Sequence, residues 1–146
     1  MSRRTARQHS FNLVFQIPFH TDWDEAELQN VTANYFENLP DLFGLIQGVS
    51  VTDTDRAFIE HEITGVFNNL VSIDNLLSKR LRNWRLDRIS KIDLALLRLA
   101  VYEIEFFEDI SPGTAISEAI RLAKSYGAAE APKFINGLLG KVARDG

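Results

Sequence analysis

The sequence predicts an all-α fold in a single domain. Apolar residues recur at the three- and four-residue spacings of an amphipathic helix along almost the whole chain. No segment shows the strict alternation of a half-buried β-strand, and no Asn-Gly or Asp-Gly turn joins two such segments. The length of 146 residues suits one domain that buries a hydrophobic core without disulfides or metals.

The first part of the chain is expected to contain an N-terminal helix and then more acidic segments. The N-terminal helix spans about residues 3–17 and stops at Pro18, because proline has no backbone N–H to continue it. An acidic, amphipathic helix is predicted over residues 23–39, before Pro40. A short apolar piece follows over residues 42–46.

A capping signal marks the next helix. Thr52 is followed three residues later by Asp55, which places a hydroxyl and an acid at the positive end of the helix dipole. The apolar stripe of this helix consists of Phe58, Ile59, Ile63, Val66, Phe67 and Leu70. Another helix is marked by Ile73, Leu76, Leu77 and Leu81, and it ends in the basic segment before Trp84.

The strongest helical signal lies between about Asp87 and Phe107. Within residues 94–102, only Arg98 is neither apolar nor aromatic. A helix that is apolar on all sides is buried on all sides, which places this segment at the centre of the bundle. A charge there requires a partner, because desolvating an isolated ion costs several kcal/mol. We therefore expect Arg98 to pair with an Asp or Glu of a neighbouring helix.

Two further helices complete the chain. Ser111 and Pro112 are the residue types favoured at an N-cap and in a first helical turn. Gly127 favours the end of that helix. The last helix is expected to begin near Pro132, and its apolar residues are Phe134, Ile135, Leu138, Leu139 and Val142.

Charge is distributed unevenly along the chain, although the net charge is only −4. Residues 22–62 hold ten acids and one base, whereas residues 79–98 hold seven bases and two acids. The first eight residues contain Arg3, Arg4 and Arg7 without an acid. An isoelectric point near 5.4 argues against general coating of nucleic acid, which is typical of strongly basic domains. Local basic patches on an acidic body favour a directed contact, and a merely solvated face is the alternative.

The residue inventory excludes several classes of function. The chain has no Cys, which excludes disulfide scaffolds, thiolate catalysis and cysteine-ligated metal centres. Its three histidines have no partner at metal-ligand spacing, and no glycine-rich phosphate-binding loop occurs. No apolar run is long enough to span a bilayer, and the basic N-terminus lacks the apolar stretch of a signal peptide. We expect a cytoplasmic protein that is not an enzyme and uses no metal or cofactor.

The N-terminal helix carries an unusual mixture of side chains beside its apolar face. At about 100° per residue, its core-facing residues are Ala6, Ser10, Leu13, Val14 and Ile17. The adjoining face carries Arg4, Arg7, Gln8, Phe11 and Phe15. Arginines that neutralise phosphates and flat rings that stack on bases are the means by which proteins bind single-stranded nucleic acid. The alternative is that a neighbouring helix covers both rings.

A second candidate surface lies near the C-terminus. Tyr126 precedes the helix-ending Gly127. Lys133 and Phe134 fall in the first turn of the last helix, where free backbone N–H groups favour phosphate. Phe134 also fits the edge of the apolar stripe of that helix, so packing and base contact both stay open.

Several blocks of the sequence, in this order, resemble the NusB family of bacterial transcription antitermination factors. The blocks are residues 3–7 (RRTAR), 86–89 (LDRI), 97–103 (LRLAVYE), 115–119 (AISEA), 122–127 (LAKSYG) and 133–137 (KFING). With the rest of the N-terminal helix they cover well over half of the chain, and their combined specificity is high. The acidic stretch over residues 23–51 matches no such block.

This resemblance implies one all-helical domain made of two perpendicular sub-bundles, over about residues 1–82 and 83–146. It also implies binding of the boxA element of nascent ribosomal RNA, jointly with NusE, a small-subunit ribosomal protein. The pair helps to assemble an antitermination complex on RNA polymerase. Neither a reaction nor a cofactor is implied, and a homodimer is compatible with the sequence. The predicted RNA-binding residues are Arg3, Arg4, Arg7, Phe15 and Phe134, carried over from the family, with Tyr126 and Lys133.

The chain departs from the family pattern at three places. Phe15 stands where the family often has Tyr, so a stacking face is kept and a hydroxyl contact is lost. Ser117 replaces a usual Asn, and Gly113 loosens the preceding turn. Two other interpretations stay open: a NusB-like RNA-binding module that serves an RNA methyltransferase, and a protein-only adaptor whose Arg/Phe face binds another helix.

Overall fold

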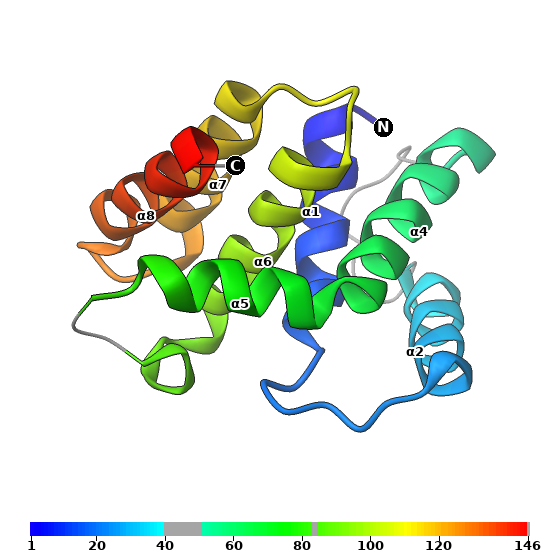
Figure 1. Cartoon of the computed structure of the whole chain (residues 1–146). Helices are drawn as coiled ribbons and strands as arrows, with labels where there is room; N and C mark the ends of the chain where they lie inside the picture. The colour runs from blue at the N-terminus through cyan, green and yellow to red at the C-terminus, as the bar shows by residue number, and fades with distance from the viewer. Residues whose placement is uncertain (40–50, 83–84, 146) are drawn as a thin grey trace.

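The computed structural model describes residues 1–39, 51–82 and 85–145, which form helices and no strands. The all-α prediction is confirmed. The helices are α1 (Arg3–Phe15), α2 (Glu25–Glu37), α4 (Asp53–Asn68), α5 (Leu70–Arg80), the short 3-10 helix η1 (Leu86–Arg88), α6 (Lys91–Phe106), α7 (Pro112–Tyr126) and α8 (Ala131–Asp145) (Figure 1). The apolar piece predicted over residues 42–46 lies outside the described residues. Within the described ranges, no helix is both long and apolar enough to cross a membrane.

Polar side chains fix where five of these helices begin. The side chains of Ser2, Asp24, Thr52, Ser90 and Ser111 each accept the backbone N–H three residues further on. Such a cap satisfies a donor that the helix itself leaves unpaired, and it contributes about 1 kcal/mol. Thr52 also forms the predicted capping box, in which its own N–H donates to the carboxylate three residues on at 3.0 Å.

The strongest helix begins later than its apolar pattern predicts. The sequence indicates a helix over residues 87–107, but Leu86–Arg88 form a separate 3-10 turn and α6 starts at Lys91. Ser90 has a non-helical backbone conformation, and its side chain caps the N–H of Asp93. The cap therefore outweighs the apolar pattern in setting this boundary.

Helix α6 lies at the centre of the structure. Its residues 94–103 are all buried, and it contacts α1, α4, α5, α7 and α8. Figure 1 shows α6 between α7 and α8 on one side and α1 and α4 on the other. At Gly65 of α4 an added Cβ would collide with the ring of Tyr102, so glycine permits the close approach of α4 to α6. The expected central, fully buried helix is confirmed, whereas the division into sub-bundles near residue 82 stays a prediction.

Arg98 of α6 has the internal partner that its buried position requires. The side chain is 1% exposed, and its Nε and Nη2 donate to the two carboxylate oxygens of Asp74 at 3.0 and 2.9 Å. Asp74 belongs to α5, so the predicted pairing with an acid of a neighbouring helix is confirmed. The guanidinium also donates to the carbonyl oxygen of Phe19 at 3.1 Å. One side chain thus joins α6 to α5 and to the segment that follows α1.

We expect Arg98→Ala to lower the free energy of unfolding by about 3–5 kcal/mol, because it leaves a void and the unpaired carboxylate of Asp74. Arg98→Leu fills the space with apolar atoms and should lose less. Chemical denaturation measures both values. In the Arg98→Ala background, Asp74→Asn should cost little more, since its partner is already absent. An Arg98→Ala protein that unfolds like the wild type would contradict this account of the core.

Candidate nucleic-acid interface

Helix α1 presents part of its surface to solvent. Arg3 and Arg4 are exposed in its first turn, and Phe15 is 41% exposed in its last. The helix ends at Phe15 rather than at Ile17, because the N–H groups after it bond back over three residues and tighten the final turn before Pro18. Part of the apolar Phe15 ring therefore stays in contact with water, although burial would be favourable for it.

Three aromatic side chains form a row that we call the aromatic row: Phe15, Phe11 and Tyr126. The ring of Phe11 lies 6.4 Å from that of Phe15 and 5.6 Å from that of Tyr126, centroid to centroid. Phe11 is 4% exposed, whereas Tyr126 is 44% exposed, and its hydroxyl accepts a hydrogen bond from the Gln8 amide. A neighbouring helix therefore covers Phe11, which was the alternative, but it leaves Phe15 and Tyr126 open to solvent.

A carboxylate on α7 holds two arginines beside the aromatic row. Glu118 Oε1 accepts from Arg4 Nη2 at 3.1 Å, and its Oε2 accepts from Arg121 Nε at 2.9 Å. Burial alone would raise the pKa of Glu118, but the hydrogen bonds from Arg121 and Arg4 lower it below its usual value. Two positive groups thus share one negative group, which leaves a net positive charge. We call the region formed by Arg4, Arg121, Phe15 and Tyr126 the α1 and α7 surface.

Arg121 is a member of this surface that the sequence analysis missed. Its spacing from Glu118 indicates a pair on one helix, but only the tertiary structure brings Arg4 to the same carboxylate. Arg3, in contrast, lies over the ring of Phe58 on α4, 4.0 Å from its centroid. Arg3 and Arg4 therefore lie against different helices, although they are adjacent in the sequence.

The prediction that Arg7 lies on the exposed face of α1 is wrong. Its side chain is 4% exposed, and its Nε donates to Glu103 Oε2 of α6 at 2.9 Å. The helical position of Arg7 borders the core face, and the buried acid on α6 draws it inward. Because its guanidinium is taken up in the interior, Arg7 anchors α1 and is not a phosphate contact.

A second buried acid, Glu62 of α4, lies next to this ion pair. Glu62 is fully buried, and neither carboxylate oxygen has a well-formed hydrogen bond within the described residues. Its polar neighbours are Glu103, Ser10 and Arg7. Burial, and then the proximity of Glu103, raise the pKa of Glu62 well above its usual value. One arginine thus faces two carboxyl groups, and burial beside Glu103 favours the neutral form of Glu62.

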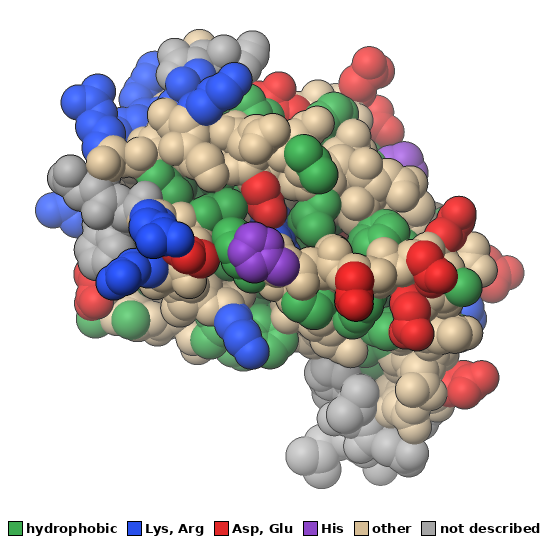
Figure 2. Space-filling model, turned by 60° about the horizontal axis from the view of Figure 1, so that its bottom comes forward, with side chains coloured by type: hydrophobic (Ala, Val, Ile, Leu, Met, Phe, Trp, Pro, Cys, Tyr) green, Lys and Arg blue, Asp and Glu red, His purple; other side chains and the backbone are tan. Residues whose placement is uncertain are grey.

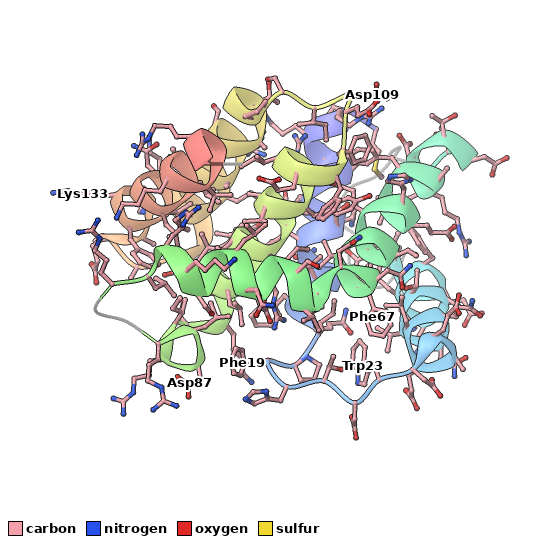
Figure 3. All side chains as sticks on the ribbon, in the orientation of Figure 1. Phe19, Trp23, Phe67, Asp87, Asp109 and Lys133 are labelled. Atoms are coloured by element: carbon pink, nitrogen blue, oxygen red, sulfur yellow. The ribbon has the colours of Figure 1, made fainter. Side chains whose placement is uncertain are left out.

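The two predicted residues of α8 lie at a separate site. Lys133 is exposed and projects outward from α8, as Figure 3 shows. Phe134 is half-buried and lines a groove of about 690 Å³ between the end of α5, η1 and α8. We call this the basic groove, since Arg80, Arg82, Arg88, Lys133 and Lys141 line it. Phe134 therefore packs against its neighbours and still presents part of its ring to the groove, which is compatible both with core packing and with base contact.

The predicted residues thus fall into distinct places. Arg4, Phe15 and Tyr126 share the α1 and α7 surface, while Lys133 and Phe134 share the basic groove. Among the described residues, no group of three or more His, Asp or Glu side chains is arranged to hold a metal ion. Cations with exposed aromatic rings suit a flexible polyanion with flat bases, which is the chemistry of single-stranded RNA.

Comparison with known proteins finds the same fold and related sequences. A family model described as the NusB family matches residues 4–144. The transcription antitermination protein NusB of Acetivibrio thermocellus is 38% identical over 144 residues, which cover 99% of this chain and 90% of that protein. The structure of T. maritima NusB has a TM-score of 0.80 at 34% identity and covers 99% of this chain and 92% of its own. The crystal structure of antitermination factors NusB and NusE with dsRNA has a TM-score of 0.75 at 19% identity, covering 99% and 97%, and shows the shared fold.

We expect Glu62→Gln to remove a pH dependence of stability. A carboxyl whose pKa is raised on folding stabilises the protein fully below the unfolded value, near 4.5. That contribution is lost as the pH rises towards the raised value. The amide side chain of the variant cannot ionise. The melting temperature of the variant minus that of the wild type should therefore increase as the pH rises from acidic to alkaline. Glu60→Gln, on the same helix but more exposed, serves as the control. A constant difference between Glu62→Gln and the wild type across the pH range would refute a raised pKa.

Proposed function

We propose that this chain, which belongs to the NusB family, is an RNA-binding transcription antitermination factor without enzymatic activity. Its ligand is the boxA element of nascent ribosomal RNA, which it binds jointly with the ribosomal protein NusE. The observation that carries the proposal is the match of family and fold over nearly the whole chain, which includes Arg4, Phe15, Arg121 and Tyr126 of the α1 and α7 surface. The family's curated members are named as transcription antitermination proteins.

The geometry of the surface supports RNA as the ligand. Arg4 and Arg121 supply positive charge on opposite sides of one carboxylate. Phe15 and Tyr126 offer exposed rings on either side of the buried Phe11. Phosphates bind to guanidinium groups and unpaired bases stack on aromatic faces, so the surface provides both parts of single-strand recognition.

The charge distribution is compatible with the partners that the family implies. An acidic chain with local basic patches repels RNA over most of its surface, and a second, basic subunit would supply the missing attraction. A solved structure of NusB with NusE and dsRNA supports this arrangement for a protein of the same fold. We propose that the complex forms in the cytoplasm on transcribing RNA polymerase, with the free protein as a monomer or a homodimer.

Titration with boxA RNA at several salt concentrations, with and without NusE, tests the proposal. We expect Arg4→Gln to lower the slope of log affinity against log salt by about 0.7, the value of one phosphate contact with a single strand. Arg7→Gln should instead lower the melting temperature and leave that slope unchanged. If wild-type affinity does not depend on salt, phosphates are not bound. If RNA is not bound under any condition while a helical protein partner is, the chain is an adaptor.

Two phenylalanines one turn apart on α1 separate stacking from packing. Phe15→Ala should change the free energy of unfolding by less than about 1 kcal/mol, because its side chain is 41% exposed at the end of the helix and surface substitutions cost little. It should weaken RNA binding by about 1–3 kcal/mol, the worth of one base stacked on a ring. Phe11→Ala should cost about 3–5 kcal/mol of stability, as a buried ring does. A thermal melt and an RNA titration of both variants decide the case, and a large loss of stability in Phe15→Ala with normal affinity would place that ring in the core.

A further inference from the structure

Three ionisable side chains meet in the interior, where α1, α4 and α6 pack together. Figure 2 shows many Lys, Arg, Asp and Glu side chains on the outer surface of one face of the molecule. Arg7 of α1, Glu62 of α4 and Glu103 of α6, in contrast, are all buried. Two acids and one base cannot all be ionised there without leaving a negative charge in the interior, which desolvation makes costly. The protonation of this cluster and the packing of the three helices are therefore linked.

Glu62 is the member of the cluster whose charge is not compensated. The Nε of Arg7 donates to Glu103 Oε2 at 2.9 Å, which pairs the arginine with that acid. Both carboxylate oxygens of Glu62 are shielded from solvent, and among the described residues neither has a well-formed hydrogen bond. A buried carboxyl in such a place is favoured in its neutral form, because its ionised form needs a cation or water. Glu62 is therefore the proton-binding group of the cluster.

The groups that face Glu62 come from two of the helices packed against α4. Arg7 and the hydroxyl of Ser10 face it from α1, while Glu103 and Tyr102 face it from α6. Helices α5 and α2 also contact α4, but in the described part of the chain none of their titratable groups acts on Glu62. Burial raises the pKa of Glu62 most, followed by Glu103, whereas Ser10 and Arg7 lower it. Ionisation therefore makes Glu62 a competitor of Glu103 for Arg7.

Arg7 connects this cluster to the α1 and α7 surface. It lies on the same helix as Arg4, which donates to Glu118 of α7 at 3.1 Å, and as the exposed Phe15. The backbone hydrogen bonds of a helix hold its turns together, so a displacement at one residue is passed to the others. A negative charge on Glu62 draws Arg7 or water towards it and disturbs the contact of α1 with α4. The groups that α1 presents to a ligand then lose their fixed positions.

We propose that the buried Glu62 couples RNA binding to proton binding, so that RNA is bound more tightly when Glu62 is protonated than when it is ionised. With the proton in place, Arg7 stays with Glu103, and α1 keeps the orientation that exposes Arg4 and Phe15. Without the proton, two carboxylates divide one guanidinium, and the packing of α1 on α4 and α6 loosens. The coupling is reciprocal, because RNA that selects the intact surface also favours proton uptake. The inference rests on the proposed function for its ligand, and it gives a regulatory role to a residue that contacts no RNA.

Titration with boxA RNA over a series of pH values tests the coupling. The wild type is compared with Glu62→Gln, which keeps the shape of the side chain but cannot ionise, and with Glu60→Gln, which removes an exposed acid of the same helix. As the pH rises through the raised pKa of Glu62, wild-type affinity should fall relative to that of Glu62→Gln, by up to about tenfold per pH unit for one linked proton. At acidic pH the two affinities should agree, and Glu60→Gln should follow the wild type. Other titratable groups near α1, such as His9 and the Met1 amine, are present in all three proteins, so their effects cancel in the ratio.

Proton uptake on binding provides an independent measurement. Isothermal titration calorimetry with boxA RNA, in two buffers of different ionisation enthalpy, counts the protons that are taken up for each RNA bound. Near the midpoint of the affinity curve, the wild type should take up a larger fraction of a proton than Glu62→Gln, and that fraction should equal the slope of the curve. Glu62→Leu, which also cannot ionise, repeats both measurements if the buried amide of Glu62→Gln lowers the melting temperature.

Nuclear magnetic resonance follows α1 without RNA. The ring signals of Phe11 and Phe15 should move with pH in one transition in the wild type, because the proton on Glu62 controls how α1 is held. Glu62→Gln should lose this transition, and Glu60→Gln should keep it.

Each remaining outcome overturns a definite statement. Equal pH profiles of RNA affinity in the wild type and Glu62→Gln refute the inference and leave the proposed function standing. A changing affinity ratio with ring signals that do not titrate shows that Glu62 acts through its charge alone, which overturns the coupling through α1. If the wild type binds no RNA at any pH, with or without NusE, the proposed function fails and the proton-linked affinity fails with it.

Discussion

Helix α6 carries two opposite charges into the centre of the protein, and the surrounding helices are arranged to neutralise them. Arg98 is held by Asp74 of α5, and Glu103 is held by Arg7 of α1. Neither charge could be buried alone, because desolvating an unpaired ion costs several kcal/mol, more than a single packing contact contributes. The two pairs therefore fix which face of α1 and which face of α5 turn towards α6. Apolar packing supplies most of the stability, and the ion pairs determine the orientation.

The orientation of α1 has a direct consequence for the outer surface. Arg7 is drawn inward to Glu103, so Arg4, three residues earlier, is turned towards α7 and meets Glu118. The same rotation covers Phe11 and leaves Phe15 exposed. The candidate RNA surface is thus built by the contact that anchors the helix. A helix held rigidly by a buried ion pair positions its exposed side chains more precisely than a flexible loop does.

Charge on this protein is arranged to guide a polyanion rather than to attract it generally. The acidic stretches lie in α2, α4 and the segments beside them, away from the bases that end α5 and line α8. A ligand that approaches the acidic side is repelled, and one that approaches the basic side is held. The acids that do lie near cations, such as Glu118 and Asp87, hold guanidinium groups in place. Affinity for a polyanion then depends on a small number of contacts.

The sequence by itself determined the helical architecture, because helix periodicity and capping are properties of neighbouring residues. Thr52, Ser90 and Ser111 each cap a helix through a backbone group only three residues away. It also determined that Arg98 must have an acidic partner, since a charge in an apolar segment requires one. Family membership followed from blocks of residues that are contiguous in the chain. The choice of Asp74 as that partner, in contrast, depended on how α5 packs against α6.

The tertiary structure alone decided which of two similar residues faces solvent. Arg4 and Arg7, like Phe11 and Phe15, lie close together on a helical wheel, and no local rule separates them. Glu103 and the end of α7, which are far away in the sequence, assign one of each pair to the interior. The same holds for the basic groove, whose cations come from residues 80–88 and 133–141. Such sites arise from contacts between distant segments, and those contacts exist only when all the helices have packed.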